Sequence, residues 1–113
     1  MLTFLKRLFA GAPSITVDEL DALLAQRAVN LIDVREPGEF KSGHVPGAVN
    51  IPVGQLDARI AKLKKDKPYA VICASGSRSS SATYFLLEHG FEGAVSVRGG
   101  TGAWQRSGRK TVR

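Results

Sequence analysis

Cys73 is the only cysteine in this sequence of 113 residues, and its surroundings favour a reactive thiol. It follows a short apolar run, Tyr69 to Ile72, and opens a segment of small residues that ends at Ser80. A strand that leads into such a loop, with a helix directly after it, turns backbone N–H groups and a helix N-terminus toward the side chain. Helix N-termini and neighbouring cations lower the pKa of a thiol from about 8.5 to about 3.5–7.5. We therefore expect Cys73 to be substantially ionised at neutral pH and to act as a nucleophile.

The residues after Cys73 form a candidate substrate-binding loop. Gly76 is expected to supply a turn at positive φ, which a side chain would obstruct. Ser75 and Ser77 could donate hydrogen bonds, although small size alone would also explain them. Arg78 either contacts an anionic substrate or ties the loop to a carboxylate, and the sequence leaves both alternatives open. The complete candidate loop consists of Ala74, Ser75, Gly76, Ser77, Arg78 and Ser79.

Four stretches of the chain together resemble the rhodanese family of sulfurtransferases. The loop from Cys73 to Arg78 is similar to the family's active-site pattern C-x-x-G-x-R. Residues 31–40 resemble its D-V-R-E segment, residues 43–52 its G-H-I-P-G-A segment, and residues 99–104 its closing G-G-x-x-x-W. Each motif alone is a weak signal, but their order along the chain makes the resemblance strong. It covers residues 14 to 108, nearly the whole sequence.

The resemblance implies a sulfurtransferase that works by double displacement. The Cys73 thiolate would take the outer sulfur of thiosulfate or of another persulfide donor and become a persulfide, which cyanide or a thiol then discharges. Because the sequence holds no second cysteine to resolve the persulfide, the acceptor is expected from outside. No cofactor and no metal are expected. Ala74 and Ser75 are neutral and Glu39 is acidic, so the affinity for thiosulfate is expected to be modest.

Two other classes of function remain as alternatives. One is a rhodanese-like binding module without catalysis, which an intact cysteine and loop disfavour. The other is a phosphatase or arsenate reductase, which shares the fold and the cysteine. The loop from Cys73 to Arg78 has the spacing C-x4-R, whereas the related phosphatases resemble C-x5-R, and a shorter ring of amides suits a sulfur atom better than a tetrahedral phosphate.

Other polar residues support the loop or the fold. The resemblance suggests that Asp33 and Arg35 brace the active loop, and an ion pair of Arg35 with Glu36 or Glu39 is the interpretation that we prefer for the arginine. His44 is interpreted as a hydrogen-bonded turn residue. Trp104 is interpreted as part of the core or of a pocket wall.

Alternating apolar runs and helical patterns predict an α/β fold, a parallel sheet of about five strands with helices on both faces. Cys73 would then lie at the carboxyl ends of the strands, where active sites of such sheets are found. Thr16 and Glu19 form a capping box that starts the first helix. The expected strands are residues 14–16, 28–34, 48–51, 69–73 and 94–97, and the expected helices are residues 16–27, 53–63 and 79–90 with a short helix from Pro37.

The net charge of +6 favours small anions near the molecule. The basic residues are not interleaved with aromatic residues in the way that nucleic-acid binding requires, so they indicate a solvated helix face and a frayed basic tail. One cysteine excludes an intramolecular disulfide framework and indicates a reducing, cytoplasmic setting.

The expected organisation is an N-terminal amphipathic tail and linker at residues 1–13, a rhodanese-like domain at residues 14–108 and a basic tail at residues 109–113. Residues 1–10 are more apolar than a free tail, but Lys6 and Arg7 interrupt any secretory signal. Packing on the domain or fraying is preferred for this segment. Pairing with a second copy and contact with a membrane surface are the alternatives.

Overall fold

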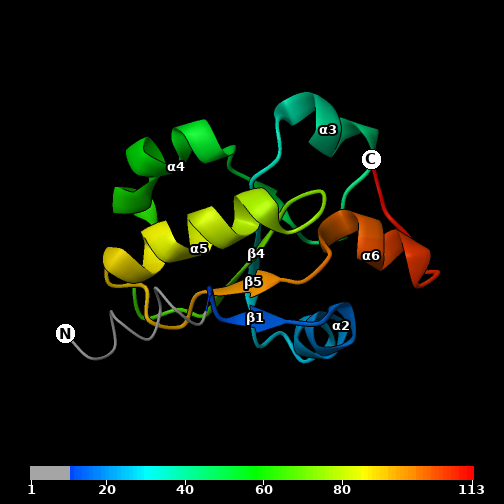
Figure 1. Ribbon diagram of the computed structural model, residues 1–113, viewed down its shortest axis with the longest axis horizontal. Coiled ribbons are helices and arrows are strands. Elements are labelled where there is room, and N and C mark those ends of the chain that lie inside the picture. Colours follow the sequence, from blue (N-terminus) through cyan, green and yellow to red (C-terminus); the bar gives the residue numbers. More distant parts are fainter. Residues whose placement is uncertain (1–10) are drawn as a thin grey trace.

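A parallel sheet forms the centre of the computed structural model, which describes residues 11–113 (Figure 1). The order is β1-β5-β4-β2-β3, and neighbouring strands pair in parallel throughout. The central strand is therefore β4, which leads directly to Cys73. This architecture confirms the α/β fold expected from the sequence. The strands are β1 (Ser14–Ile15), β2 (Asn30–Asp33), β3 (Val49–Asn50), β4 (Tyr69–Ile72) and β5 (Val95–Val97).

Helices follow the strands and cover both faces of the sheet. The capping box that starts α2 is confirmed, because the Glu19 N–H donates to Thr16 Oγ1 at 3.1 Å and the Thr16 N–H donates to Glu19 Oε1 at 2.9 Å. Helix α4 packs beside α5, and α2 packs beside α6 (Figure 1). The helices are α2 (Val17–Ala25), α3 (Pro37–Ser42), α4 (Val53–Arg59), the 3-10 turn η1 (Ile60–Lys62), α5 (Ser77–Glu88) and α6 (Gly100–Arg106).

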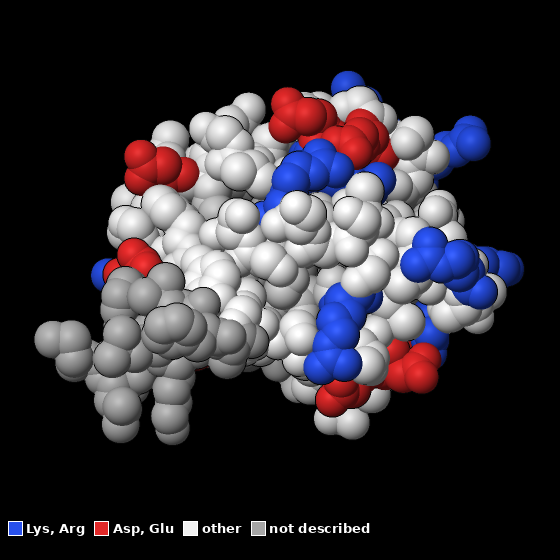
Figure 2. All heavy atoms as spheres, in the orientation of Figure 1, with Lys and Arg blue, Asp and Glu red and all other residues white. Residues whose placement is uncertain are grey.

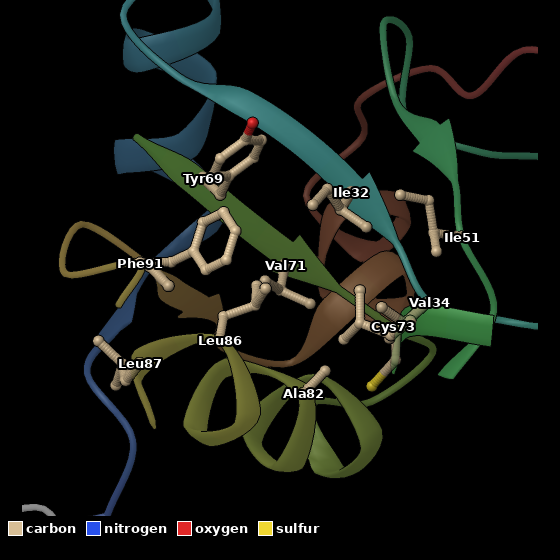
Figure 3. Packing of buried hydrophobic residues seen from close by; sticks show 12 residues of the cluster. Ile32, Val34, Ile51, Tyr69, Val71, Cys73, Ala82, Leu86, Leu87 and Phe91 are labelled. Carbon is tan, nitrogen blue, oxygen red and sulfur yellow. The ribbon is translucent and has the colours of Figure 1, made fainter. Parts of the chain in front are cut away.

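The alternation of side chains along β4 divides the core into two layers. Tyr69, Val71 and Cys73 belong to one cluster with Leu86 of α5 (Figure 3), whereas Ala70 and Ile72 point to the opposite face. Successive side chains of a strand point to opposite faces, so a strand that is buried throughout needs apolar residues at every position. The cluster on the second face also holds Leu20, Leu31, Val45, Val97 and Trp104.

Several element boundaries differ from the expected ones. Strand β2 begins at Asn30 rather than at residue 28, and α2 ends at Ala25 because Arg27 has a positive φ of 54°. Helix α5 begins at Ser77, two residues before the expected start, so Arg78 lies in its first turn. Helix α6 was not expected at all. The helix contains Gly100 and Gly102 and follows Gly99, and glycine is a poor helix former.

The C-terminal residues from Arg109 to Val112 are bonded to the domain, so the expectation of a frayed tail is wrong for them. Arg109 pairs with Asp18 at 2.8 Å and with Asp21 at 2.9 Å. Trp104 Nε1 donates to the carbonyl of Lys110 at 2.9 Å, and Val112 forms an antiparallel bridge with His44. These contacts hold the chain end beside α3 (Figure 1).

The expectation for the N-terminal apolar tail falls on residues 1–10, which lie outside the described part of the chain. Within residues 11–113, no helix combines the length and the hydropathy that crossing a membrane requires.

Gly100 provides a test of how closely α6 approaches the loop. It has a φ of +58°, and a Cβ atom there would overlap the carbonyl oxygen of Cys73 and lie 2.8 Å from that of Ala74. Gly100→Ala should therefore lower the free energy of unfolding by about 2–4 kcal/mol, because left-handed backbone and overpacking each cost about 1–3 kcal/mol. Urea denaturation measures the loss.

Gly54→Ala is the matched control, because Gly54 lies in α4 with no atom within 4 Å of an added Cβ. It should be neutral or stabilising by up to about 1 kcal/mol. Equal stabilities of the two variants would contradict the close approach of α6.

Candidate active site

Cys73 follows the last residue of β4 and points toward the N-terminal end of α5 (Figure 3). Its side chain is only 1% exposed. The sulfur accepts hydrogen bonds from the N–H groups of Gly76 at 3.0 Å and Ser79 at 3.3 Å. The loop therefore surrounds the sulfur with donors, which is the environment that a thiolate needs.

Gly76 lets the backbone turn into α5. It is the N-cap of the helix and has a φ of 112°, which confirms the expectation of a positive φ. A Cβ atom would meet its nearest neighbour, the backbone nitrogen of Gly99, at an ordinary 3.5 Å. The backbone conformation, and not a lack of space, therefore requires glycine at this position.

The carbonyl groups of the loop point away from the sulfur. Cys73 O accepts from the Thr101 N–H at 2.9 Å and from the Thr101 hydroxyl at 3.3 Å. Ala74 O accepts from the Gly102 N–H at 3.0 Å. Because the first turn of α6 binds these oxygens, the loop can turn its N–H groups toward Cys73 without leaving carbonyls unpaired.

A pair of buried hydroxyls lies behind the cysteine. Ser79 Oγ lies 3.5 Å from Cys73 Sγ, donates to the carbonyl of Gly76 at 3.1 Å and lies 2.8 Å from Ser96 Oγ. Both serines are at most 2% exposed. When the thiol ionises, the Ser79 hydroxyl can turn its proton to the sulfur while Ser96 donates to Ser79. Ser96 was not predicted from the sequence, although a lone polar residue inside a buried strand is a signal for such a role.

Two opposing effects set the pKa of Cys73. Burial disfavours the thiolate, whereas hydrogen bonds from the Ser79 hydroxyl and from the backbone N–H groups of Ser79, Gly76 and Ser75 favour it. The hydrogen bonds outweigh burial, so the pKa of the thiol lies below its ordinary value. A larger fraction of Cys73 is therefore ionised at neutral pH than of a free cysteine.

Arg78 makes a bidentate ion pair with Glu39 of α3. Its two terminal nitrogens lie 2.7 and 3.0 Å from the carboxylate oxygens. The sequence left open whether Arg78 contacts a substrate or ties the loop to a carboxylate. In the structure it ties the loop to the carboxylate of Glu39. Ala74, Ser75, Gly76 and Ser77 form the rest of the loop mouth, where Ser75 and Ser77 are exposed.

Asp33 and Arg35 bind each other, so the expected pairing of Arg35 with Glu36 or Glu39 is wrong. Both are buried, and the guanidinium donates to both carboxylate oxygens at 3.0 to 3.2 Å. Arg35 also donates to the carbonyl of Gly43 at 2.7 Å, which fixes the end of α3. The hydrogen bonds of these two side chains go to each other, to the Arg35 N–H and to the Gly43 carbonyl, so these residues support the end of α3 rather than the loop itself.

His44 and Trp104 stabilise the fold through contacts with neighbouring residues. His44 Nδ1 lies 2.8 Å from the carbonyl of Phe40, and its ring stacks on Phe40, as expected for a turn residue. Trp104 is 5% exposed and belongs to the core. In the part of the chain that the structure describes, no group of three or more His, Cys, Asp or Glu side chains could hold a metal ion.

This chain is similar in sequence and in fold to known proteins. The family model of the rhodanese-like domain matches residues 16–107. A sulfurtransferase of Allochromatium vinosum is 34% identical, with 85% of this chain and 95% of the relative covered. The thiosulfate sulfurtransferase GlpE of Shewanella oneidensis is 31% identical, with coverages of 82% and 92%. A crystal structure of a rhodanese-related protein from Thermoplasma volcanium superposes with a TM-score of 0.82 at 38% identity, covering 88% of this chain and 97% of that one.

Replacing Ser79 tests the hydroxyl behind the sulfur. Ser79→Ala removes the side-chain donor that favours the thiolate, so the pKa of Cys73 should rise. The rate of alkylation by iodoacetamide, followed against pH, should show its midpoint at higher pH and a loss of about 3–10-fold near neutrality. Ser81→Ala, at an exposed position of the same helix, should leave the profile unchanged. An unchanged profile for Ser79→Ala would show that the backbone donors suffice.

Replacing Arg35 tests the buried ion pair. Arg35→Met leaves the Asp33 carboxylate buried without its partner, and breaking such a pair costs about 3–5 kcal/mol. The free energy of unfolding, measured in urea, should fall by this amount and recover partly in the double variant Asp33→Asn with Arg35→Met. Arg59→Met, at an exposed position of α4, is the control and should change stability little. A loss no larger than that of the control would contradict a structural role for Arg35.

Proposed function

Because the chain belongs to the rhodanese-like domain family, we propose that it is a sulfurtransferase that moves a sulfane sulfur through a persulfide on Cys73. The donor is thiosulfate or another persulfide, and the acceptor is a thiol or cyanide. The relatives named as sulfurtransferases support the transferase class. Since Cys73 is the sole cysteine of the sequence, the reaction suits a reducing compartment such as the cytoplasm.

The observation that carries the proposal is the set of donors on the Cys73 sulfur. N–H groups at 3.0 and 3.3 Å and the nearby Ser79 hydroxyl surround a sulfur that water scarcely reaches. Preorganised donors stabilise developing negative charge strongly in a site with little water, because they need no reorganisation during the reaction. The same donors favour the thiolate before the transfer.

In the first half-reaction, the Cys73 thiolate attacks the outer sulfur of the donor. With thiosulfate, a new sulfur–sulfur bond forms to Cys73, the old sulfur–sulfur bond breaks, and sulfite leaves with the electron pair. The enzyme then carries a persulfide anion. The loop N–H groups and the N-terminal end of α5 stabilise its charge.

In the second half-reaction, an external nucleophile attacks the terminal sulfur of the persulfide. Cyanide forms thiocyanate, or a thiolate forms a new persulfide, and the Cys73 thiolate is the leaving group. The low pKa of Cys73 assists this step, because a more acidic thiol leaves faster. The loop therefore serves both halves of the cycle by favouring the thiolate form of the cysteine.

Intact-mass analysis tests the proposal directly. The protein incubated with thiosulfate or with a small organic persulfide should gain the mass of one sulfur atom and lose it on addition of cyanide. Cys73→Ser should gain no sulfur, because a serine hydroxyl is scarcely ionised at neutral pH. Circular dichroism should confirm that this nearly isosteric variant keeps the fold. A Cys73→Ser variant that still gains a labile sulfur, or a parent that gains none from either donor, would refute the proposal.

A further inference from the structure

The ion pair between Arg78 and Glu39 occupies the rim of the site. Arg78 is the second residue of α5 and the only charged residue between positions 74 and 79. Glu39 is the third residue of α3. Figure 2 shows acidic and basic side chains in contact where α3 meets the N-terminal part of α5. The charge that an anionic substrate would meet on the loop is therefore already neutralised.

Glu39 is held in position by a second bond. Its Oε1 also accepts from the Glu36 N–H at 3.0 Å, as part of the capping box of α3. The hydrogen bond from Arg78 and the one from Glu36 together lower the pKa of Glu39 to about 2. The carboxylate is therefore charged throughout the neutral range and is paired with the arginine.

The neighbouring arginines do not replace the neutralised charge. Arg35 is buried and is bound by the carboxylate of Asp33. Arg106 lies beside Gly102 on α6, where a Cβ atom would come within 3.0 Å of its guanidinium. It is exposed, so water screens its attraction for an anion, and water screens the half-exposed pair of Arg78 and Glu39 in the same way.

We infer that Glu39 is a specificity-determining residue that disfavours doubly charged small donors and directs the site to organic persulfides. This inference rests on the proposed sulfur transfer. Thiosulfate carries two charges and would have to compete with Glu39 for Arg78 or lie beside the carboxylate. A persulfide carries at most one charge on its sulfur and needs no cation at the rim. An unfavourable charge placed against one of two substrates is an established way to discriminate between them.

The transfer from a persulfide balances without any further reactant. The Cys73 thiolate attacks the outer sulfur of R–S–SH, the bond between the two donor sulfurs breaks, and R–S⁻ leaves with the electron pair. Cys73 then carries –S–SH, with the proton that the outer sulfur held. One negative charge is present before and after the step.

The test compares two donors under single-turnover conditions, with sulfur gain followed by intact mass. The donors are thiosulfate and 2-hydroxyethyl persulfide, which has no charge outside its sulfur group. The central variant is Glu39→Gln, because glutamine at the third position of a helix also completes a capping box and so keeps α3 intact. Glu92→Gln is the matched control for net charge, since residue 92 is exposed and follows the opposite end of α5.

Glu39→Gln should raise the ratio of the thiosulfate rate constant to the persulfide rate constant by about 3–10-fold, because the carboxylate no longer repels the dianion, while water weakens the effect at side chains that are 39% and 37% exposed. Adding Arg78→Gln to this variant should remove the gain, since the freed guanidinium is what binds the dianion. Higher salt should reduce the gain. Glu92→Gln should leave the ratio unchanged.

An unchanged or lower ratio in a folded Glu39→Gln variant would overturn the inference while leaving sulfur transfer intact. A parent protein that takes sulfur from thiosulfate faster than from the persulfide would also overturn it, without recourse to any variant. A parent that takes sulfur from neither donor would instead refute the proposed function, and the inference with it.

Discussion

The polarity of the loop peptides is the constraint on which the site depends. A peptide group presents an N–H and a carbonyl on opposite sides, so a loop that turns its N–H groups inward must find partners for its oxygens outside. Here the N–H groups in the first turn of α6 donate to the carbonyls of Cys73 and Ala74. The donors on the sulfur therefore exist because a segment about thirty residues later in the chain packs against the back of the loop.

A second set of contacts positions the rim. The buried pair of Asp33 and Arg35 holds the carbonyl of Gly43 and thereby the end of α3. Helix α3 carries Glu39, which binds Arg78 in the first turn of α5. Two separate ion pairs thus connect these elements: Asp33 with Arg35 next to α3, and Glu39 of α3 with Arg78 of α5. The net charge of the protein is a poor guide to the potential at such a mouth.

The sequence predicted the features that depend on local pattern. Apolar runs located all five strands, the capping box at Thr16 located α2, and the small residues after Cys73 located the loop with a positive φ at Gly76. Features that depend on tertiary contacts could not be predicted from local sequence pattern. Helix α6 forms from a glycine-rich segment because the loop carbonyls fix its first turn, and Ser96 matters only because the sheet brings β5 behind Cys73.

The ion-pair partner of Arg35 is a further example of a contact that local sequence pattern does not predict. The expected partner of Arg35 was Glu36 or Glu39, which follow it closely in the sequence. The chain instead leaves β2 so that the guanidinium folds back on Asp33, and this return is a property of the strand end rather than of any helical period. Ion-pair partners at the carboxyl ends of strands are therefore harder to assign than partners within a helix.

The attachment of the chain end beside α3 has a practical consequence. Val112 pairs with the backbone of His44, and Lys110 is bound by the indole of Trp104, so the terminal residues act as a strap across the segment that follows α3. Any polypeptide joined to Arg113 would emerge next to the helix that bears Glu39. An affinity tag placed there would begin beside α3, whereas removing the strap would leave the indole N–H of Trp104 and the backbone of His44 without these partners.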